Sequence, residues 1–378
     1  MNLFNLVSKL TVQILFVIIF FSNLQAKNID KYNKGDDISD YFSGIVLLND
    51  NQYNESYKFL KRLNGLEDSH LNYSSRYLYS LINLGKFEEA FKYSKKIEKK
   101  NLDIFESNLI IGIYFLKNKQ FDLAQKYFLK LKQKNSNYLL NTFVSNSLLN
   151  WSSLDNLTLN EAQEKINSID PRFENLKKIQ NVFLHCFYKS TKTEFYFKKL
   201  TSNDKVDFSR YNYFYSNFLV GINNNNQAEK IIDSSLRLYP RNLLLNQYKF
   251  DLENGVNKSN FNCKNQSHVV AEILYIAANA LSSQSIYKFS NFYLNLSKYL
   301  NEDFYAFNIL LAENYYNIEK LQEAKEVYNN IRKYGNTFYW YASKQNSRIL
   351  IKEKKIEEAL ELLSNDYKKL TNKSIYQT

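Results

Sequence analysis

The sequence predicts an all-α fold, a solenoid of stacked helix pairs, and three observations carry this prediction. Aromatic, small and large apolar residues recur at one constant offset in the first third of the chain. Apolar residues make up 44% of the 378 residues and aromatic residues 16%, which is ample for a core. Only two prolines and eight glycines occur, so long helices are rarely interrupted. The offset, a period of about 34 residues, is typical of repeats that bury their apolar faces on their neighbours.

Residues 1–26 lie outside the repeat and have the pattern of a secretory signal peptide. Lys9 supplies a positive charge, residues 10–21 are apolar except for Thr11 and Gln13, and a polar exit ends at Ala26. We therefore expect residues 1–26 to be removed during export, by cleavage after Ala26. The alternative is an uncleaved anchor formed by residues 10–21, although a membrane-spanning helix needs about 20 apolar residues.

Residues 27–252 are predicted to form an N-terminal array of helix pairs. The repeated positions, each one period apart, are Tyr53, Phe87 and Phe121; Ser56, Ala90 and Ala124; and Leu63, Ile97 and Leu131. We expect Ala90, Ala124 and the first-helix glycines Gly44 and Gly112 to let paired helices approach closely, while Phe87 and Phe121 fill the gap between pairs. The spacing drifts around residues 137–205, where helix pairs such as 138–154 with 159–166 are still predicted.

Residues 253–267 are polar and rich in Asn, and predict an exposed loop that separates this array from a C-terminal one. The loop is an inert insertion, a hinge or a partner contact. In the C-terminal array, residues 268–370, the small residues recur at the same offset in two pairs, Ala278 with Ala312 and Ser290 with Ala324. A last unit containing Ile356, Ala359 and Leu363 is expected to cap the array, and residues 371–378 to form a tail.

The best units have the motifs Phe121-x2-Ala124-x3-Phe128-x2-Leu131 and Leu321-x2-Ala324-x3-Tyr328-x2-Ile331. Ala228 is also followed twelve residues later by Pro240, at the end of a predicted second helix. These motifs resemble the tetratricopeptide repeat (TPR) family over about residues 27–370, and look most like its exported bacterial members. The resemblance implies a right-handed α-solenoid that binds other proteins, in the bacterial periplasm or anchored to the inner membrane by residues 10–21.

In that family, side chains of the first helices line a concave groove. The corresponding positions here are Tyr41, Tyr79, Tyr213, Asn217, Tyr275, Asn279, Tyr316, Tyr341 and Lys344. A groove of Tyr and Asn combines rigid amphipathic area with adaptable hydrogen bonding, which suits peptide or glycan capture. The alternative is that several of these tyrosines only pack between neighbouring first helices.

No catalytic, cofactor-binding or metal-binding residue is predicted. The three histidines, His70, His185 and His268, have no metal-ligand spacing, and no glycine-rich phosphate loop occurs. The net charge of +12 raises the question of nucleic-acid binding. Basic and acidic residues alternate along the helices, however, which is typical of solvated helix faces, so we expect no nucleic-acid partner.

Cys186 and Cys263, the only cysteines, lie about two repeats apart in the sequence. In a solenoid that separation is beyond bridging distance unless the loop folds back, so we expect two free thiols.

Together these features predict a non-enzymatic, non-catalytic scaffold of the bacterial cell envelope that binds a protein or peptide partner in its concave groove. The alternatives are a membrane-anchored envelope assembly factor and an accessory subunit of a cell-wall enzyme. Membrane contact is expected only through an uncleaved signal peptide or through a partner.

Overall fold

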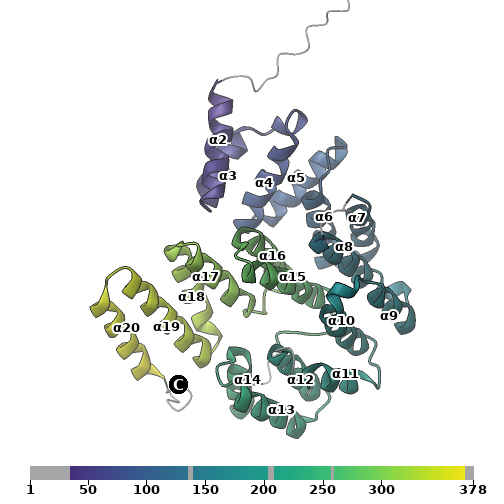
Figure 1. Ribbon diagram of the computed structural model, residues 1–378, viewed down its shortest axis with the longest axis vertical. Coiled ribbons are helices and arrows are strands. Elements are labelled where there is room, and N and C mark those ends of the chain that lie inside the picture. The colour runs from purple at the N-terminus through teal and green to yellow at the C-terminus, as the bar shows by residue number, and fades with distance from the viewer. Residues whose placement is uncertain (1–34, 135–138, 203–207, 257–258, 371–378) are drawn as a thin grey trace, which may run out of the picture. The chain divides into compact units, whose positions relative to one another are not determined.

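The computed structural model describes residues 35–134, 139–202, 208–256 and 259–370, and every regular element in these ranges is helical (Figure 1). This confirms the predicted all-α, helical-repeat fold class. The predicted signal peptide, residues 1–26, and the predicted tail, residues 371–378, lie outside the described residues. Among the described helices, none is both long enough and apolar enough to cross a membrane.

The chain divides into two compact units, Met1–Ser80 and Leu81–Thr378. The elements that begin in the first unit are α2 (Gly35–Asn49), α3 (Tyr53–Arg62), the 3-10 helix η1 (Leu66–Asp68) and α4 (Leu71–Asn83), which crosses the boundary. In this unit α2 and α3 pack closely because Gly44 has no side chain. The Ser56 hydroxyl of α3 donates a hydrogen bond of 2.8 Å to the Gly44 carbonyl, so small residues form this contact from both helices.

The second unit contains the rest of the described helices. Its first part consists of α5 (Phe87–Lys99), α6 (Phe105–Lys117), α7 (Phe121–Lys134), α8 (Leu139–Ser152), η2 (Leu154–Asn156), α9 (Leu159–Asn167), η3 (Pro171–Phe173), α10 (Glu174–Phe187), α11 (Thr193–Thr201), α12 (Ser209–Gly221), α13 (Asn225–Leu238) and α14 (Leu243–Glu253). Its second part consists of α15 (Gln266–Ser283), α16 (Tyr287–Leu300), α17 (Phe307–Asn317), α18 (Leu321–Ile331), η4 (Arg332–Tyr334), α19 (Asn336–Lys352) and α20 (Ile356–Lys369).

Small residues of the second helices are buried along the whole chain, as the repeat period predicts. Those with no exposed side-chain surface are Ser56, Ala90, Ala124, Ala228, Ser290 and Ala324, and Ala359 in α20 is 2% exposed. The large apolar residues at the third repeated position, Leu63, Ile97 and Leu131, are also fully buried. The repeat is therefore built on a seam where paired helices approach closely.

The aromatic position of the repeat differs from the prediction. Phe87 and Phe121 are only half-buried, whereas Phe128, one turn after Ala124, has no exposed surface. A side chain at Gly112 of α6 would lie within 3.0 Å of three ring atoms of Phe128, so this ring fills the space between α6 and α7. Phe87 instead stacks on Tyr299, at the end of α16, with ring centroids 4.3 Å apart.

Helices α15 and α16 pack back against the first part of the second unit, touching α6 and α8 (Figure 1). The Ser267 hydroxyl donates to the Leu116 carbonyl at 3.2 Å, and the Lys117 ammonium donates to the Tyr299 carbonyl at 2.6 Å. The two predicted arrays are thus in contact. Their division at residues 253–267 stays a prediction.

The loop between the predicted arrays is not exposed throughout. Helix α14 ends at Glu253 and α15 begins at Gln266. Between them, Asn260 is 7% exposed and Phe261 is 3% exposed. The prediction of a fully exposed loop is wrong for these residues, because Phe261 enters the core.

Candidate functional site

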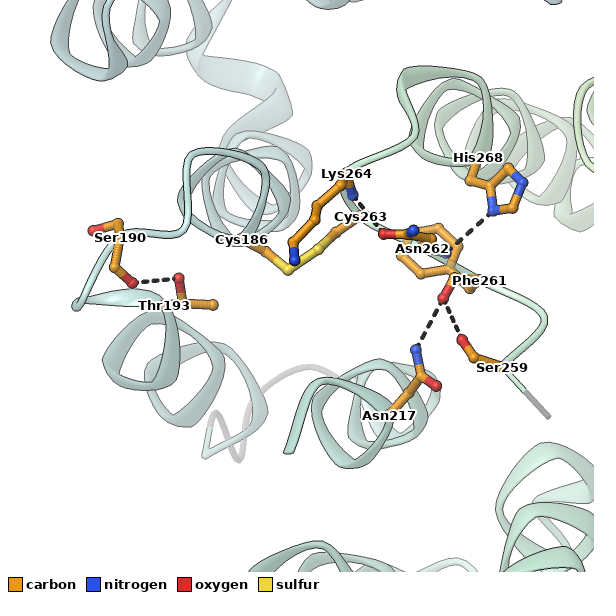
Figure 2. The surroundings of a disulfide bond; sticks show 10 residues. All are labelled: Cys186, Ser190, Thr193, Asn217, Ser259, Phe261, Asn262, Cys263, Lys264 and His268. Carbon is orange, nitrogen blue, oxygen red and sulfur yellow. Dashed lines mark hydrogen bonds between the residues drawn. A yellow bond between two sulfur atoms is a disulfide. The ribbon is translucent and has the colours of Figure 1, made fainter. Parts of the chain in front are cut away.

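A disulfide joins Cys186, near the end of α10, to Cys263, in the loop before α15 (Figure 2). The two Cα atoms are 5.9 Å apart. The prediction of two free thiols is therefore wrong. The prediction relied on the separation of the two cysteines in the sequence, about two repeats. In the structure the loop folds back onto α10, so the two cysteines are close in space.

Phe261 is the residue that holds this loop against the helices. Its ring centroid lies 4.4 Å from that of Phe214 in α12 and 5.1 Å from that of Phe183 in α10. Its carbonyl accepts hydrogen bonds from the Asn217 amide at 3.0 Å and from the Ser259 hydroxyl at 2.7 Å (Figure 2). An aromatic anchor and the disulfide thus fix the loop at two neighbouring points.

A pocket of about 680 Å³ lies beside the disulfide. Its walls are the end of α10, the start of α11, the end of α12 and the loop residues 259 and 261–264. This size is within the range of small-molecule sites in proteins. The pocket is also lined by Asn217, one of the predicted groove residues.

The pocket combines an apolar interior with charged groups. Phe197, Phe214 and Val220 form buried wall, and the ammonium groups of Lys189 and Lys264 belong to exposed side chains at its edge. The pocket also contains a carboxylate, Glu194, which already accepts a hydrogen bond from a lysine and from a tyrosine.

Glu194 pairs with Lys198 at 2.7 Å and accepts from the Tyr215 hydroxyl at 3.3 Å. The bond to Lys198 lowers the pKa of Glu194 despite its partial burial, so it stays ionised at neutral pH. Lys198 compensates the negative charge of Glu194. The electrostatic potential in the pocket is therefore positive, because of Lys189 and Lys264.

Two of the predicted groove residues lie in the core. Tyr79 is 9% exposed and Tyr213 is 4% exposed. Tyr213 packs against the rings of Tyr248 and Phe304 at centroid distances of 5.1 and 5.8 Å, and burial raises its pKa well above the usual value. For these two positions the structure favours packing between helices over a groove lining. Tyr213 is covered by α14, through Tyr248, and by the segment after α16, through Phe304.

Three further predicted residues, Tyr41, Tyr275 and Asn279, are at least partly accessible. Tyr41, in the first unit, is half-buried with its ring 4.7 Å from that of His70. Tyr275 of α15 is half-buried, and the guanidinium of Arg210 lies 3.9 Å from its ring centroid. Asn279, one turn further along α15, is exposed. The partner-binding role of these side chains stays a prediction.

The remaining three, Tyr316, Tyr341 and Lys344, share one surface formed by α17 and α19. The Tyr341 hydroxyl donates to the Glu313 carboxylate at 2.8 Å, which links the two helices. The Arg348 guanidinium lies 4.2 Å from the Tyr316 ring centroid. We call this surface the α17–α19 face, with the members Glu313, Tyr316, Tyr341, Lys344, Arg348 and Lys352.

The α17–α19 face carries more positive than negative charge. Lys352 pairs with Glu319 at 3.0 Å, and Tyr341 engages Glu313. Lys344 and Arg348 are exposed, and neither forms an ion pair with an acid among the described residues. Burial of its stem and the nearby charge of Arg241 lower the pKa of Lys344. The face therefore offers cations and aromatic rings together.

Sequence reasoning missed the buried ion pair between Arg210 of α12 and Glu272 of α15. The two groups meet in a bidentate arrangement at 2.7 and 2.8 Å, and Glu272 has no exposed surface. A signal was present, because Glu272 is the one charged residue in the apolar run from Val269 to Leu274. The partner could not be found without the fold, since 62 residues separate the two.

Two of the histidines, His185 and His268, make contacts within the fold. His185 is 2% exposed and stacks on Tyr196 at 4.0 Å, and burial lowers its pKa. His268 accepts a hydrogen bond through Nδ1 from the Asn262 backbone amide at 3.1 Å. Within the described ranges, no three His, Cys, Asp or Glu side chains converge as metal ligands would.

No protein-family model and no curated protein matches this chain. Solved structures similar to it include yeast Tom70, at 12% identity over 89% of this chain and 92% of that one, with a TM-score of 0.24. The P58(IPK) TPR domain is 14% identical over 89% of this chain and 94% of that one, with a TM-score of 0.25.

The human IFIT1 dimer with m7Gppp-AAAA is a third similar structure, 12% identical over 92% of this chain and 93% of that one, with a TM-score of 0.26. At these identities and TM-scores the similarity carries no argument about function. The helical-repeat class rests on the chain's own helices and on their buried, periodic small residues.

Proposed function

We propose that this chain is a non-catalytic scaffold of the bacterial cell envelope that binds a protein partner through the α17–α19 face. The observation that carries the proposal is the grouping of Tyr316, Tyr341 and Lys344 on one accessible surface with Arg348. Tyrosine and arginine are the side chains that most often supply binding energy at protein interfaces, because they combine large contact area with directed hydrogen bonds.

The charge of the face defines the partner's chemistry. Lys344 and Arg348 favour a segment that carries Asp or Glu side chains, since opposite charges steer association and fix orientation. The Tyr316 ring, with Arg348 against it, provides an apolar surface for the neighbouring side chains of the same segment. We therefore expect an extended acidic segment of an envelope protein.

Two features support a location outside the cytoplasm. The apolar stretch at residues 10–21 followed by Ala26 has the pattern of an export signal. The Cys186–Cys263 disulfide is of a kind that persists in oxidising compartments and is rare in the cytosol. Each feature is independent of the other, and both favour export.

The test is site-specific photocrosslinking of the exported chain in its native cells. A benzoylphenylalanine is placed at Tyr316, and a matched control probe at the exposed Lys230 of α13. We expect an envelope protein to crosslink at position 316 and not at position 230. Arg348→Glu should reduce that crosslink several-fold, because it places a negative charge in front of an acidic partner.

An equal yield at both positions would contradict the proposal, as would a crosslink that Arg348→Glu leaves unchanged. A nucleic acid crosslinked at position 316 in place of a protein would also overturn it, because the cationic face would then serve a different class of partner.

A further inference from the structure

We propose that the pocket beside the Cys186–Cys263 disulfide binds a single-chain anionic amphiphile, such as a long-chain carboxylate. The apolar chain lies against the phenylalanine walls, and the carboxylate lies between Lys189 and Lys264. This inference does not depend on the α17–α19 face, because the pocket is built from other helices.

The interior of the pocket suits an alkyl chain. Phe197 is 1% exposed and Phe214 is 2% exposed, while Phe218 and Ile222 bring more accessible apolar surface toward the mouth. Ile222 is 52% exposed. A bound chain would remove this surface from water, and such burial is the main favourable term for apolar ligands.

The mouth of the pocket suits an anion. The ammonium groups of Lys189 and Lys264 face no carboxylate partner among the described residues, and Glu194 is engaged by Lys198. The helix ends at the pocket carry partial charges of both signs. The C-terminal ends of α10 and α12 are negative, and the N-terminal end of α11 is positive. Each end corresponds to about half a charge. Two full positive charges therefore exceed the net effect of the helix ends, and the site favours a negative head group.

The disulfide holds one wall of this pocket in place. Lys264 follows Cys263 directly and lies alongside the disulfide (Figure 2). Phe261 and Asn262 of the same loop also line the pocket. The bond to Cys186 therefore keeps both the lysine and part of the apolar wall in position for a ligand. Reduction should weaken binding, because the loop that carries Lys264 is then no longer tied to α10.

The test is isothermal titration calorimetry of the oxidised chain with dodecanoate below its micelle concentration. We expect saturable binding of one dodecanoate, with affinity falling about fourfold for each methylene removed in decanoate and octanoate. Dodecyltrimethylammonium and dodecyl maltoside, which carry the same chain on cationic and neutral heads, should bind at least tenfold more weakly.

Variants separate the pocket from non-specific uptake. The double change Lys189→Gln and Lys264→Gln should weaken dodecanoate binding about tenfold, as two partly exposed charge contacts allow. Lys230→Gln, an exposed lysine of α13 outside the pocket, is the matched control and should change nothing. Reductant should weaken binding to the wild-type chain and leave a Cys186→Ala, Cys263→Ala variant unaffected.

Three results would overturn the inference. The first is no heat of binding from dodecanoate. The second is equal affinity for the cationic and anionic amphiphiles, which would show that the lysines do not select the head group. The third is binding that the double lysine variant retains in full, which would place the ligand elsewhere on the chain.

Discussion

At the scale of single residues, one tight packing constraint in the array is at Gly112. Its position in α6 faces the ring of Phe128, which is fully buried. Protein interiors are packed as densely as organic crystals, so even one methyl group in such a place is felt.

The change Gly112→Ala should therefore lower the free energy of unfolding by about 1–3 kcal/mol, because overpacking outweighs the gain in helix propensity. Urea denaturation followed by circular dichroism measures the change. Gly221→Ala is the matched control: a Cβ there meets nothing within 4 Å, so stability should stay equal or rise. A stable Gly112→Ala would show that the close contact is absent.

A second residue-scale feature is the ionised Glu98, which joins α5 to α7. Burial alone would raise the pKa of Glu98, but hydrogen bonds from Lys130 at 2.7 Å, from Lys95 and from Tyr127 at 2.9 Å outweigh it. They lower the pKa from 4.5 to about 2. A lowered folded-state pKa stabilises the protein above the unfolded pKa, and this contribution is lost as pH falls from about 4.5 toward 2.

Glu98→Gln should accordingly cost about 1–3 kcal/mol of unfolding free energy at pH 7, since the three donors lose their charged acceptor. The difference between variant and wild type should shrink as pH falls toward 2. Thermal unfolding across this pH range measures it. Glu88→Gln, at an exposed position of the same helix, should have little effect at either pH. A pH-independent difference would refute the role of the ionised carboxylate.

The burial of a residue could be predicted from the sequence where the packing around it accepts only one kind of side chain. Ala90 and Ala124 could be placed from the sequence, because a close helix contact accepts only small residues and recurs once in every repeat. The half-buried position of Phe121 could not be predicted, because a sequence does not distinguish a half-buried aromatic residue from a fully buried one. Phe128, part of the same motif, is the fully buried ring, and it fills the space between α6 and α7.

At the scale of elements, the segment between α14 and α15 determines how distant helices of the second unit pack against one another. It is anchored by Phe261 and tied to α10 by the disulfide, while the next helix inserts Glu272 against Arg210 of α12. A polar, Asn-rich sequence gave no indication of this role. One aromatic in a polar loop is too weak a signal, and pairing of distant cysteines depends on the path of the chain.

Replacing Cys186 and Cys263 with Ala should lower the free energy of unfolding by about 2–4 kcal/mol, because the crosslink restricts a loop of 77 residues in the unfolded chain. Urea denaturation with and without reductant measures the effect. The wild type should lose stability on reduction, while the double variant should not respond. A wild type indifferent to reductant would contradict the bond.

The ion pair between α12 and α15 gives a second element-scale prediction. Glu272→Gln should cost about 3–5 kcal/mol, because it leaves the Arg210 charge in a largely buried site without its partner. The paired change Arg210→Met with Glu272→Leu should recover most of this loss, as buried pairs are often replaceable by apolar ones. Thermal melts of the three proteins decide between these outcomes. Equal melting temperatures would show that the pair is not buried.

At the scale of the whole molecule, the helical-repeat class was predictable because one period recurs over residues 53–131 and again over residues 278–324. The site was predictable only in part. Position in a repeat placed Tyr316, Tyr341 and Lys344 on one accessible surface, but it also selected Tyr213, which α14 and the segment after α16 cover. A repeat pattern describes contacts between neighbours and carries no information about contacts between distant repeats.

The proposed envelope partner, the persistence of the disulfide and the wall of the pocket all depend on one claim, that this helical-repeat chain works in an oxidising compartment outside the cytoplasm. Intact-mass spectrometry of the chain isolated from its native cells without reductant tests this claim most directly. We predict a mass that lacks residues 1–26 and two hydrogen atoms, with Cys186 and Cys263 in one crosslinked peptide after digestion. A chain that retains residues 1–26 and carries two alkylatable thiols would contradict the account.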